Sequence, residues 1–157
     1  MLFLCITAPI ISLANVDRQN ILFDRISAAD GLSQAAAQTL LQDRHGFIWI
    51  GTQQGLNRYD GYQFEVFNHY ADQDSSLANG YIYDLLEDNN GNLWVATDDG
   101  LDRFEPVTKS FIHYKHDPDS TNSLPDNTVR ALLKDSQGTV WIGTSAGLAR
   151  LDEEFNI

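Results

Sequence analysis

The chain has 157 residues, 43% of them hydrophobic, which is enough for one ordinary globular domain with a packed core. Only 10 Lys and Arg residues stand against 22 Asp and Glu residues, so the formal net charge is −12. This negative charge would repel nucleic-acid backbones and anionic lipid surfaces, and neither is expected as a partner.

Residues 1–14 are predicted to form a signal-peptide-like segment. Residues 2–14 carry no charge, and the small Ser12 and Ala14 are placed for cleavage before a polar stretch. The segment is shorter than the roughly 20 residues that span a membrane. The alternative is a buried first strand. The one cysteine, Cys5, lies here, so a cleaved chain would have no disulfide and would be expected in a bacterial periplasm.

One stretch of sequence occurs three times. Residues 42–59, QDRHGFIWIGTQQGLNRY, recur as EDNNGNLWVATDDGLDRF at 87–104 and as KDSQGTVWIGTSAGLARL at 134–151. The tryptophans are spaced by 94 − 49 = 45 and 141 − 94 = 47 residues. A period of this length indicates an array of one supersecondary unit.

Each copy predicts four short antiparallel strands. The first strands are residues 37–42, 81–87 and 128–134, and the second strands are residues 47–52, 93–97 and 139–144. The third strands are residues 56–60, 101–105 and 148–152, and the fourth strands are residues 63–70 and 110–116. An Asp-x-x-Gly turn joins the first two strands, with Asp and Gly at the positions that a type I turn prefers. A second glycine-containing turn leads into the third strand.

Four strands in about 45 residues are typical of one β-propeller blade, so the predicted fold is all-β with about three blades of an incomplete ring. The expected boundaries are an outer strand at about 21–27, blade 1 at 35–70, blade 2 at 80–116 and an incomplete blade 3 at 127–157, within a partial propeller over 15–157. Ala35, Ala36 and Ala37 favour helix by propensity, but their counterparts favour strand. Rings need four to eight blades, so the chain is expected to begin a longer propeller.

Residues that recur in every copy are expected to build the blades. These structural residues are Asp43, Gly46, Trp49 and Gly55; Asp88, Gly91, Trp94 and Gly100; and Asp135, Gly138, Trp141 and Gly147. The recurring Arg58, Arg103 and Arg150 are expected to pair with the turn aspartates or with neighbouring backbone.

A ligand site is expected where the copies differ. Ring topology places the loops between second and third strands on one face with the connectors to the next blade. The weak candidates for ligand binding are Gln53, Gln54, Asp98, Asp99 and Ser145 in the loops, and His69 and His116 in the connectors. No catalytic group, metal site or cofactor is predicted. His113 and His116 are three apart on a predicted strand, so they point to opposite faces.

The repeats, with DGLSQ at residues 30–34 before the first, resemble the two-component regulator propeller family over about residues 21–157. The resemblance implies an exported sensor region. In this family the propeller is followed by a β-sandwich, a transmembrane helix and a cytoplasmic histidine kinase or diguanylate cyclase, and some members bind an oligosaccharide. Ala96 departs from the family pattern, where the other copies have Gly51 and Gly143.

The favoured function is therefore the first part of a periplasmic ligand-sensing propeller in a signalling protein anchored in the inner membrane. The chain itself is not expected to be an enzyme. The expected partners are a small molecule or oligosaccharide, and the remaining blades and signalling domains of a longer chain. The alternatives are part of a propeller-fold carbohydrate-active enzyme and a protein-interaction propeller. In isolation, with both end blades uncovered, the chain is expected to self-associate.

Overall fold

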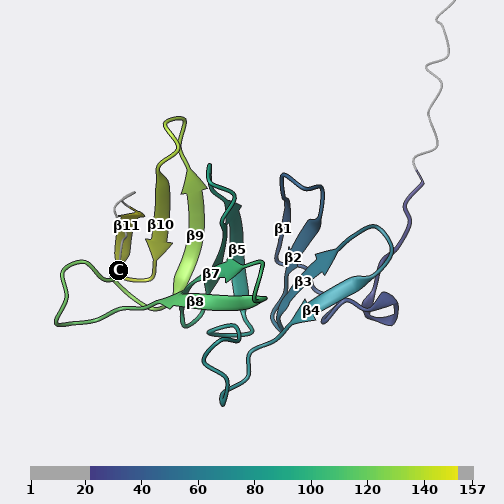
Figure 1. Ribbon diagram of the computed structural model, residues 1–157, viewed down its shortest axis with the longest axis horizontal. Coiled ribbons are helices and arrows are strands. Elements are labelled where there is room, and N and C mark those ends of the chain that lie inside the picture. The colour runs from purple at the N-terminus through teal and green to yellow at the C-terminus, as the bar shows by residue number, and fades with distance from the viewer. Residues whose placement is uncertain (1–21, 152–157) are drawn as a thin grey trace, which may run out of the picture.

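The computed structural model describes residues 22–151, which form three antiparallel β-sheets side by side (Figure 1). The first sheet contains β1 (Thr39–Gln42), β2 (Ile48–Gly51), β3 (Leu56–Tyr59) and β4 (Phe64–Phe67). The second contains β5 (Ile82–Glu87), β6 (Leu93–Thr97), β7 (Gly100–Glu105) and β8 (Ser110–Tyr114). The third contains β9 (Val129–Lys134), β10 (Val140–Thr144) and β11 (Gly147–Leu151). Each sheet pairs its strands in chain order, which confirms the all-β prediction of successive four-stranded blades.

A short 3-10 helix, η1 (Ala28–Asp30), precedes the first sheet. The signal-peptide-like segment 1–14, including Cys5, lies outside the described residues. Within residues 22–151, no helix is long and apolar enough to cross a membrane.

The turn between the first and second strands of each sheet is built by its aspartate. In the middle sheet, Asp88 Oδ1 accepts hydrogen bonds from the backbone N–H groups of Asn90 and Asn92, both at 2.9 Å. Its Oδ2 accepts from Trp94 Nε1 at 2.9 Å. Asp43 and Asp135 make the same bonds, with Trp Nε1 distances of 2.8 and 2.9 Å. The recurring aspartate and tryptophan therefore form one structural unit, as predicted.

The second turn depends on a threonine that the sequence patterns did not single out. The hydroxyl groups of Thr52, Thr97 and Thr144 each donate to the carbonyl oxygen three residues later, at 2.9, 2.8 and 2.8 Å. That residue is the recurring glycine, which has a left-handed backbone in every copy. At Gly55, with φ 119°, a Cβ atom would lie 2.6 Å from the Phe67 carbonyl oxygen, so close approach of β4 also requires glycine.

Residues 22–27 lie within the outer strand expected at about 21–27; they pair with no strand in the described part of the chain, and Phe23 is 85% exposed. The expected partner of that strand is the last blade of a complete ring, so the outer strand stays a prediction. Ser27 caps η1. Residues 35–37, expected to begin the first strand of blade 1, are irregular, and β1 starts at Thr39.

Two of the recurring arginines, Arg58 and Arg103, pair with glutamates instead of the turn aspartates. Arg58 lies opposite Glu65 in the β3–β4 register, and their side chains approach to 2.5 Å. In the β7–β8 register the residue opposite Arg103 is Ile112, so Arg103 pairs with Glu105 on its own strand at 2.8 Å. Register therefore decides the partner of each arginine.

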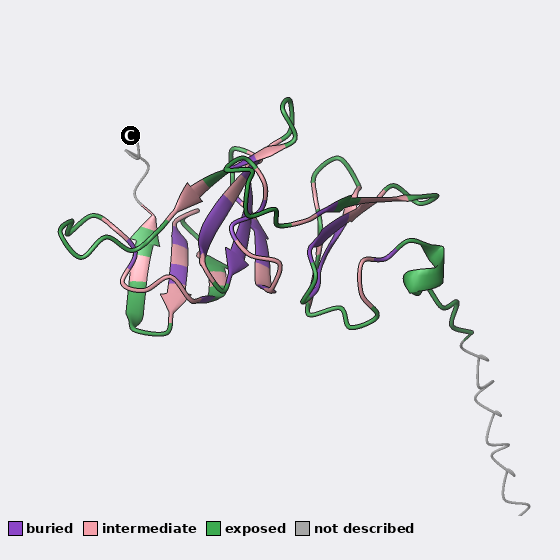
Figure 2. Ribbon diagram, turned by 90° about the horizontal axis from the view of Figure 1, so that it is seen from below, coloured by how far each residue is buried: buried purple, intermediate pink, exposed green. Residues whose placement is uncertain are grey.

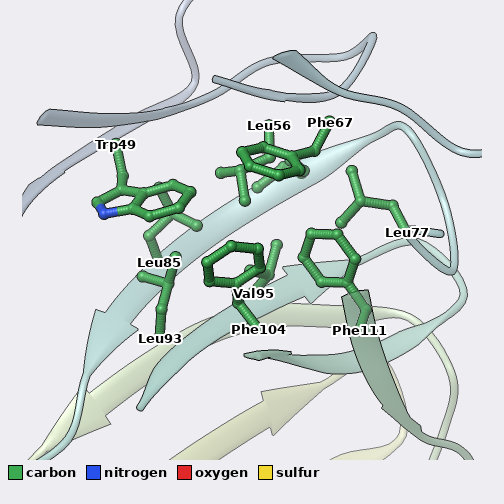
Figure 3. Close-up of a cluster of buried hydrophobic side chains, with 10 residues drawn as sticks. Trp49, Leu56, Phe67, Leu77, Leu85, Leu93, Val95, Phe104 and Phe111 are labelled. Atoms are coloured by element: carbon green, nitrogen blue, oxygen red, sulfur yellow. The ribbon is translucent and has the colours of Figure 1, made fainter. Parts of the chain in front are cut away.

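An aromatic cluster joins the first two sheets (Figure 3). The Phe104 ring centroid lies 5.1 Å from those of Trp49 and Phe67 and 5.3 Å from that of Phe111. A second buried cluster, which includes Trp94, joins the middle sheet to the third. Because the middle sheet is covered on both faces, burial is concentrated there, and all five residues of β6 are buried (Figure 2).

The third sheet is less covered. Leu56 and Leu101 occupy equivalent positions at the start of β3 and one residue into β7, and they are 0% and 1% exposed. The equivalent Leu148 is 64% exposed. The aliphatic surface that a neighbouring element covers in blades 1 and 2 is therefore open among the described residues of blade 3.

Candidate ligand-binding face

The loops between second and third strands meet the connectors between blades at one end of the sheets. Gly55 N donates to Gly80 O at 2.9 Å, and Ile82 N donates to Thr52 O at 2.9 Å. Gly100 N donates to Asn127 O at 2.6 Å one blade later. These bonds between consecutive blades place the two predicted loop sets on a common face.

A group of side chains that we call the polar aromatic cluster lies on this face. Its members are Gln53, Tyr81, Tyr83, Asp98, Arg130 and Ser145. The two tyrosine rings have centroids 4.6 Å apart, and the Arg130 guanidinium carbon lies 4.3 Å from the centre of the Tyr83 ring. The cluster therefore presents stacked aromatic surface beside a cation.

One hydrogen bond joins blade 1 to blade 2 in this cluster, the Arg130–Tyr83 contact joins blade 2 to blade 3, and two further hydrogen bonds lie within blades 2 and 3. Gln53 Nε2 of blade 1 donates to Tyr81 Oη at 3.3 Å. The Tyr83 hydroxyl group donates to Asp98 Oδ1 at 3.1 Å, and Arg130 Nε of blade 3 reaches Ser145 Oγ at 3.4 Å. Burial, and then the hydrogen bond to Asp98, raise the pKa of the Tyr83 hydroxyl group, so it remains a donor at neutral pH.

Three of the predicted binding residues, Gln53, Asp98 and Ser145, belong to this cluster. Gln54 lies in the same turn as Gln53 and its N–H group donates to Thr52 Oγ1 at 3.0 Å. Asp99 lies beside Asp98 but forms an ion pair with Lys115 at 2.6 Å. The predicted loops therefore contribute to the cluster through some of their residues only.

The two histidines among the candidates have a structural contact in common. His69 Nδ1 lies 2.7 Å from Leu77 O, and His116 Nδ1 lies 2.6 Å from Leu124 O. Because equivalent residues make the same contact in two connectors, this contact closes the connector loop. This shared contact is structural and does not by itself indicate that either histidine binds a ligand.

Sequence reasoning missed Tyr81, Tyr83 and Arg130. Tyr83 and Arg130 occupy equivalent positions on the first strands of blades 2 and 3, where blade 1 has Gln38. A comparison of the copies that included strand positions as well as loops would have found this difference.

The three sheets, their order and their shared turns define consecutive blades of a β-propeller. Residues 31–54, 76–99 and 123–146 each match the family described as Two component regulator propeller. The chain belongs to this family.

Two solved structures have similar folds and recognisable sequence similarity. The extracellular domain of the putative hybrid two component system BT3049 from B. thetaiotaomicron is 28% identical, with a TM-score of 0.76 over 83% of this chain and 19% of that one. The extracellular domain of the putative hybrid two component system BT4673 from the same organism is 30% identical, with a TM-score of 0.60 over 74% of this chain and 16% of that one.

A curated relative, Histidine kinase P4 from Formosa agariphila, is 40% identical over 59 residues. The match covers 38% of this chain and 4% of the relative. The chain therefore spans a fifth or less of the length of each of these proteins.

Proposed function

We propose that this chain is part of the periplasmic sensor propeller of a two-component histidine kinase or a diguanylate cyclase anchored in the inner membrane. Its polar aromatic cluster is the part that contacts a small-molecule or oligosaccharide ligand. The proposal is supported by family membership and by structural relatives that are extracellular domains of putative hybrid two component systems.

The chemistry of the cluster carries the ligand assignment. Ligand sites combine apolar or aromatic surface with a few polar groups that fix orientation. Here the rings of Tyr81 and Tyr83 supply the surface, while Asp98 and Arg130 supply an acceptor and donors beside it. A sugar ring has apolar faces and hydroxyl groups at its edge, which suits this combination.

The position of the cluster connects binding to signalling. Its side chains come from three consecutive blades, so a ligand that contacts them all favours one relative position of those blades. A ligand shifts a conformational equilibrium only by its difference in affinity for the two states. A site that is shared between blades can have different affinities for two relative positions of those blades, because its contacts change when the blades move.

The Tyr83→Ala variant is expected to weaken oligosaccharide binding by about tenfold or more, because truncating an aromatic side chain that a ligand contacts at the centre of a site typically costs over about 1.4 kcal/mol. Binding is measured by calorimetry with a panel of defined neutral and acidic oligosaccharides. The Tyr62→Ala variant is the matched control, since Tyr62 is 96% exposed in the turn between β3 and β4, at the opposite end of the sheet.

Equal affinity in the Tyr83→Ala variant and the wild type would exclude the polar aromatic cluster as the site. Cleavage of any oligosaccharide by the chain would favour the alternative of a carbohydrate-active enzyme. Absence of binding across the panel would contradict the oligosaccharide assignment.

The isolated chain is expected to self-associate through the open face of blade 3. Light scattering should detect species larger than a monomer, and the Leu148→Glu variant should shift them towards the monomer, because Leu148 is 64% exposed on that face. The Val107→Glu variant is the control, since Val107 is 96% exposed in a hairpin loop. A monodisperse wild-type monomer would contradict this expectation.

A further inference from the structure

The middle blade contains a buried acid that the ligand site does not use. Asp102 on β7 is 0% exposed. Its Oδ1 lies 2.6 Å from His113 Nδ1 on β8, and its Oδ2 accepts a hydrogen bond from the backbone N–H group of Ala78 at 2.8 Å. Ala78 belongs to residues 68–81, the connector between blades 1 and 2. The acid therefore binds a histidine and the connector together.

The histidine holds the same connector at a second point. His113 Nε2 lies 2.7 Å from the carbonyl oxygen of Asp74. Next to it, the backbone N–H group of Phe111 donates to Ser75 O at 3.0 Å. The connector is thus fastened to β7 and β8 at Asp74, Ser75 and Ala78.

Both ring nitrogens of His113 face acceptors, and this geometry depends on protonation. A carbonyl oxygen only accepts, so Nε2 must donate to Asp74; Nδ1 faces a carboxylate. Only the imidazolium ion donates from both nitrogens. Neutral His113 keeps one N–H group, so it must give up a bond either to the ionised Asp102 or to the connector. The carboxylate is the stronger acceptor, so the bond to Asp74 is lost.

The other blades show that the histidine is not needed for packing. In blade 1, Asn57 occupies the position of Asp102, is also 0% exposed, and accepts from Ser33 N at 2.8 Å. The residue opposite it in the register is Val66 instead of histidine. Blade 1 therefore binds the equivalent backbone N–H group with a side chain that does not titrate.

Blade 3 lacks both the backbone donor and the acceptor at these positions. The residue equivalent to Ala78 is Pro125, which has no N–H group, and the residue equivalent to Asp102 is Ala149, which has no acceptor. Among the described residues of the three blades, an acceptor stands at this position where there is a backbone donor, in blades 1 and 2, and an acid paired with a histidine occurs in blade 2.

Other charged groups lie near the pair. The positive charge of Lys115, which follows β8, acts to lower the pKa of both Asp102 and His113, and its amine forms an ion pair with Asp99. Asp117 and Arg150 line the cleft of about 930 Å³ that His113 also lines, and Asp74 contacts His113 through its backbone.

The pKa directions agree with this geometry. The hydrogen bond to Asp102 raises the pKa of His113 above its ordinary value of 6.5. The stability that the imidazolium contact adds is therefore complete below about pH 6.5 and is lost as the pH rises through the raised value. Burial raises the pKa of Asp102, so its carboxylate is costly to bury unless His113 is protonated.

We propose that Asp102 and His113 form a pH-dependent latch that fastens the connector at residues 68–81 to blade 2. Opening the latch releases the connector at Asp74, whereas the hydrogen bond from Ala78 to Asp102 still holds its end near Tyr81. The latch does not depend on the proposed function.

The test measures amide hydrogen exchange on the ligand-free 157-residue chain between about pH 6 and pH 9, corrected for intrinsic exchange, together with an NMR titration of His113. In the wild type, protection of the Phe111 amide and of residues 72–76 should fall as His113 deprotonates. The fall should be about tenfold for each unit by which the fold raises the pKa of His113.

The double variant Asp102→Asn/His113→Val reproduces the Asn57 and Val66 pair of blade 1 and should show protection that does not change with pH. The His116→Gln variant alters a histidine outside the pair and should keep the wild-type pH dependence. A wild-type His113 that titrates at its ordinary value, or a double variant with wild-type pH dependence, would overturn the proposal. If the double variant does not fold, the wild-type titration alone decides.

Because no ligand is present, failure of this test leaves the oligosaccharide assignment unaffected. Conversely, if the chain binds no oligosaccharide but the latch responds to pH as expected, the ligand assignment is contradicted and the latch is not.

Discussion

Replacing Phe104 with alanine is expected to lower the free energy of unfolding by about 3–5 kcal/mol, the typical cost of truncating a buried aromatic residue. Phe104 is 3% exposed and lies within about 5 Å of three other rings from both blades, so neighbouring groups cannot easily fill the space. Urea denaturation followed by tryptophan fluorescence measures the loss, and Trp49 in the same cluster reports it directly.

The control is Ile112→Ala, one residue from Phe111 on β8, where the side chain is 38% exposed. Its effect should stay within about 1 kcal/mol. A Phe104→Ala variant that is equally mild would show that the cluster in Figure 3 does not couple the blades.

Replacing Asp88 with alanine is expected to cost roughly 3 kcal/mol, because it removes the acceptor for several donors at once. The Trp94 Nε1–H group, which is buried, and the N–H groups of Asn90 and Asn92 would lose their partner. The matched variant Asp135→Ala breaks the equivalent backbone and tryptophan bonds, but not the bond that Asn92 Nδ2 donates to Asp88, in the more exposed turn of blade 3, where water can replace the carboxylate, and should cost less. Equal losses would show that burial does not set the cost.

The same turn gives a dependence on acid. Burial alone would raise the pKa of Asp88, but the hydrogen bonds from Asn92, Trp94 and Asn90 outweigh it, and the net pKa is lowered from its ordinary value of 3.8. The carboxylate therefore adds stability that is present above that value and is lost as the pH falls through the lowered one. The Asp88→Ala variant should lack this part of the acid transition.

The fold was largely predictable because its causes are local and repeated. The Asp-x-x-Gly turn, the tryptophan six residues after the aspartate and the alternation of short strands act within one blade, so three copies in the sequence revealed them. The first strand of blade 1 was predicted to start too early, at residues 35–37, because a strand begins where its partner does and β1 pairs with β2 only from Thr39.

The sites were less predictable because their contacts join separate copies. Tyr83 and Arg130 are 47 residues apart and stack only when the first strands of two blades lie side by side. Asp102 and His113 are opposite each other in the β7–β8 register, and the connector that they hold comes from before the blade. A reading confined to repeated residues discards such positions, because they differ between copies.

The positions of Pro125 and Ala149 indicate where one blade could be replaced by another in a chimeric protein. A junction at the start of the first strand, between residues 125 and 129, would separate the backbone position at 125 from the acceptor position at 149. In a chimera made there with blade 2, either the N–H group of Ala78 would be buried without an acceptor, or the carboxylate of Asp102 would lose its backbone donor. The unit that can be transplanted therefore begins before Leu124, ahead of the blade that the strands define, and runs through β11.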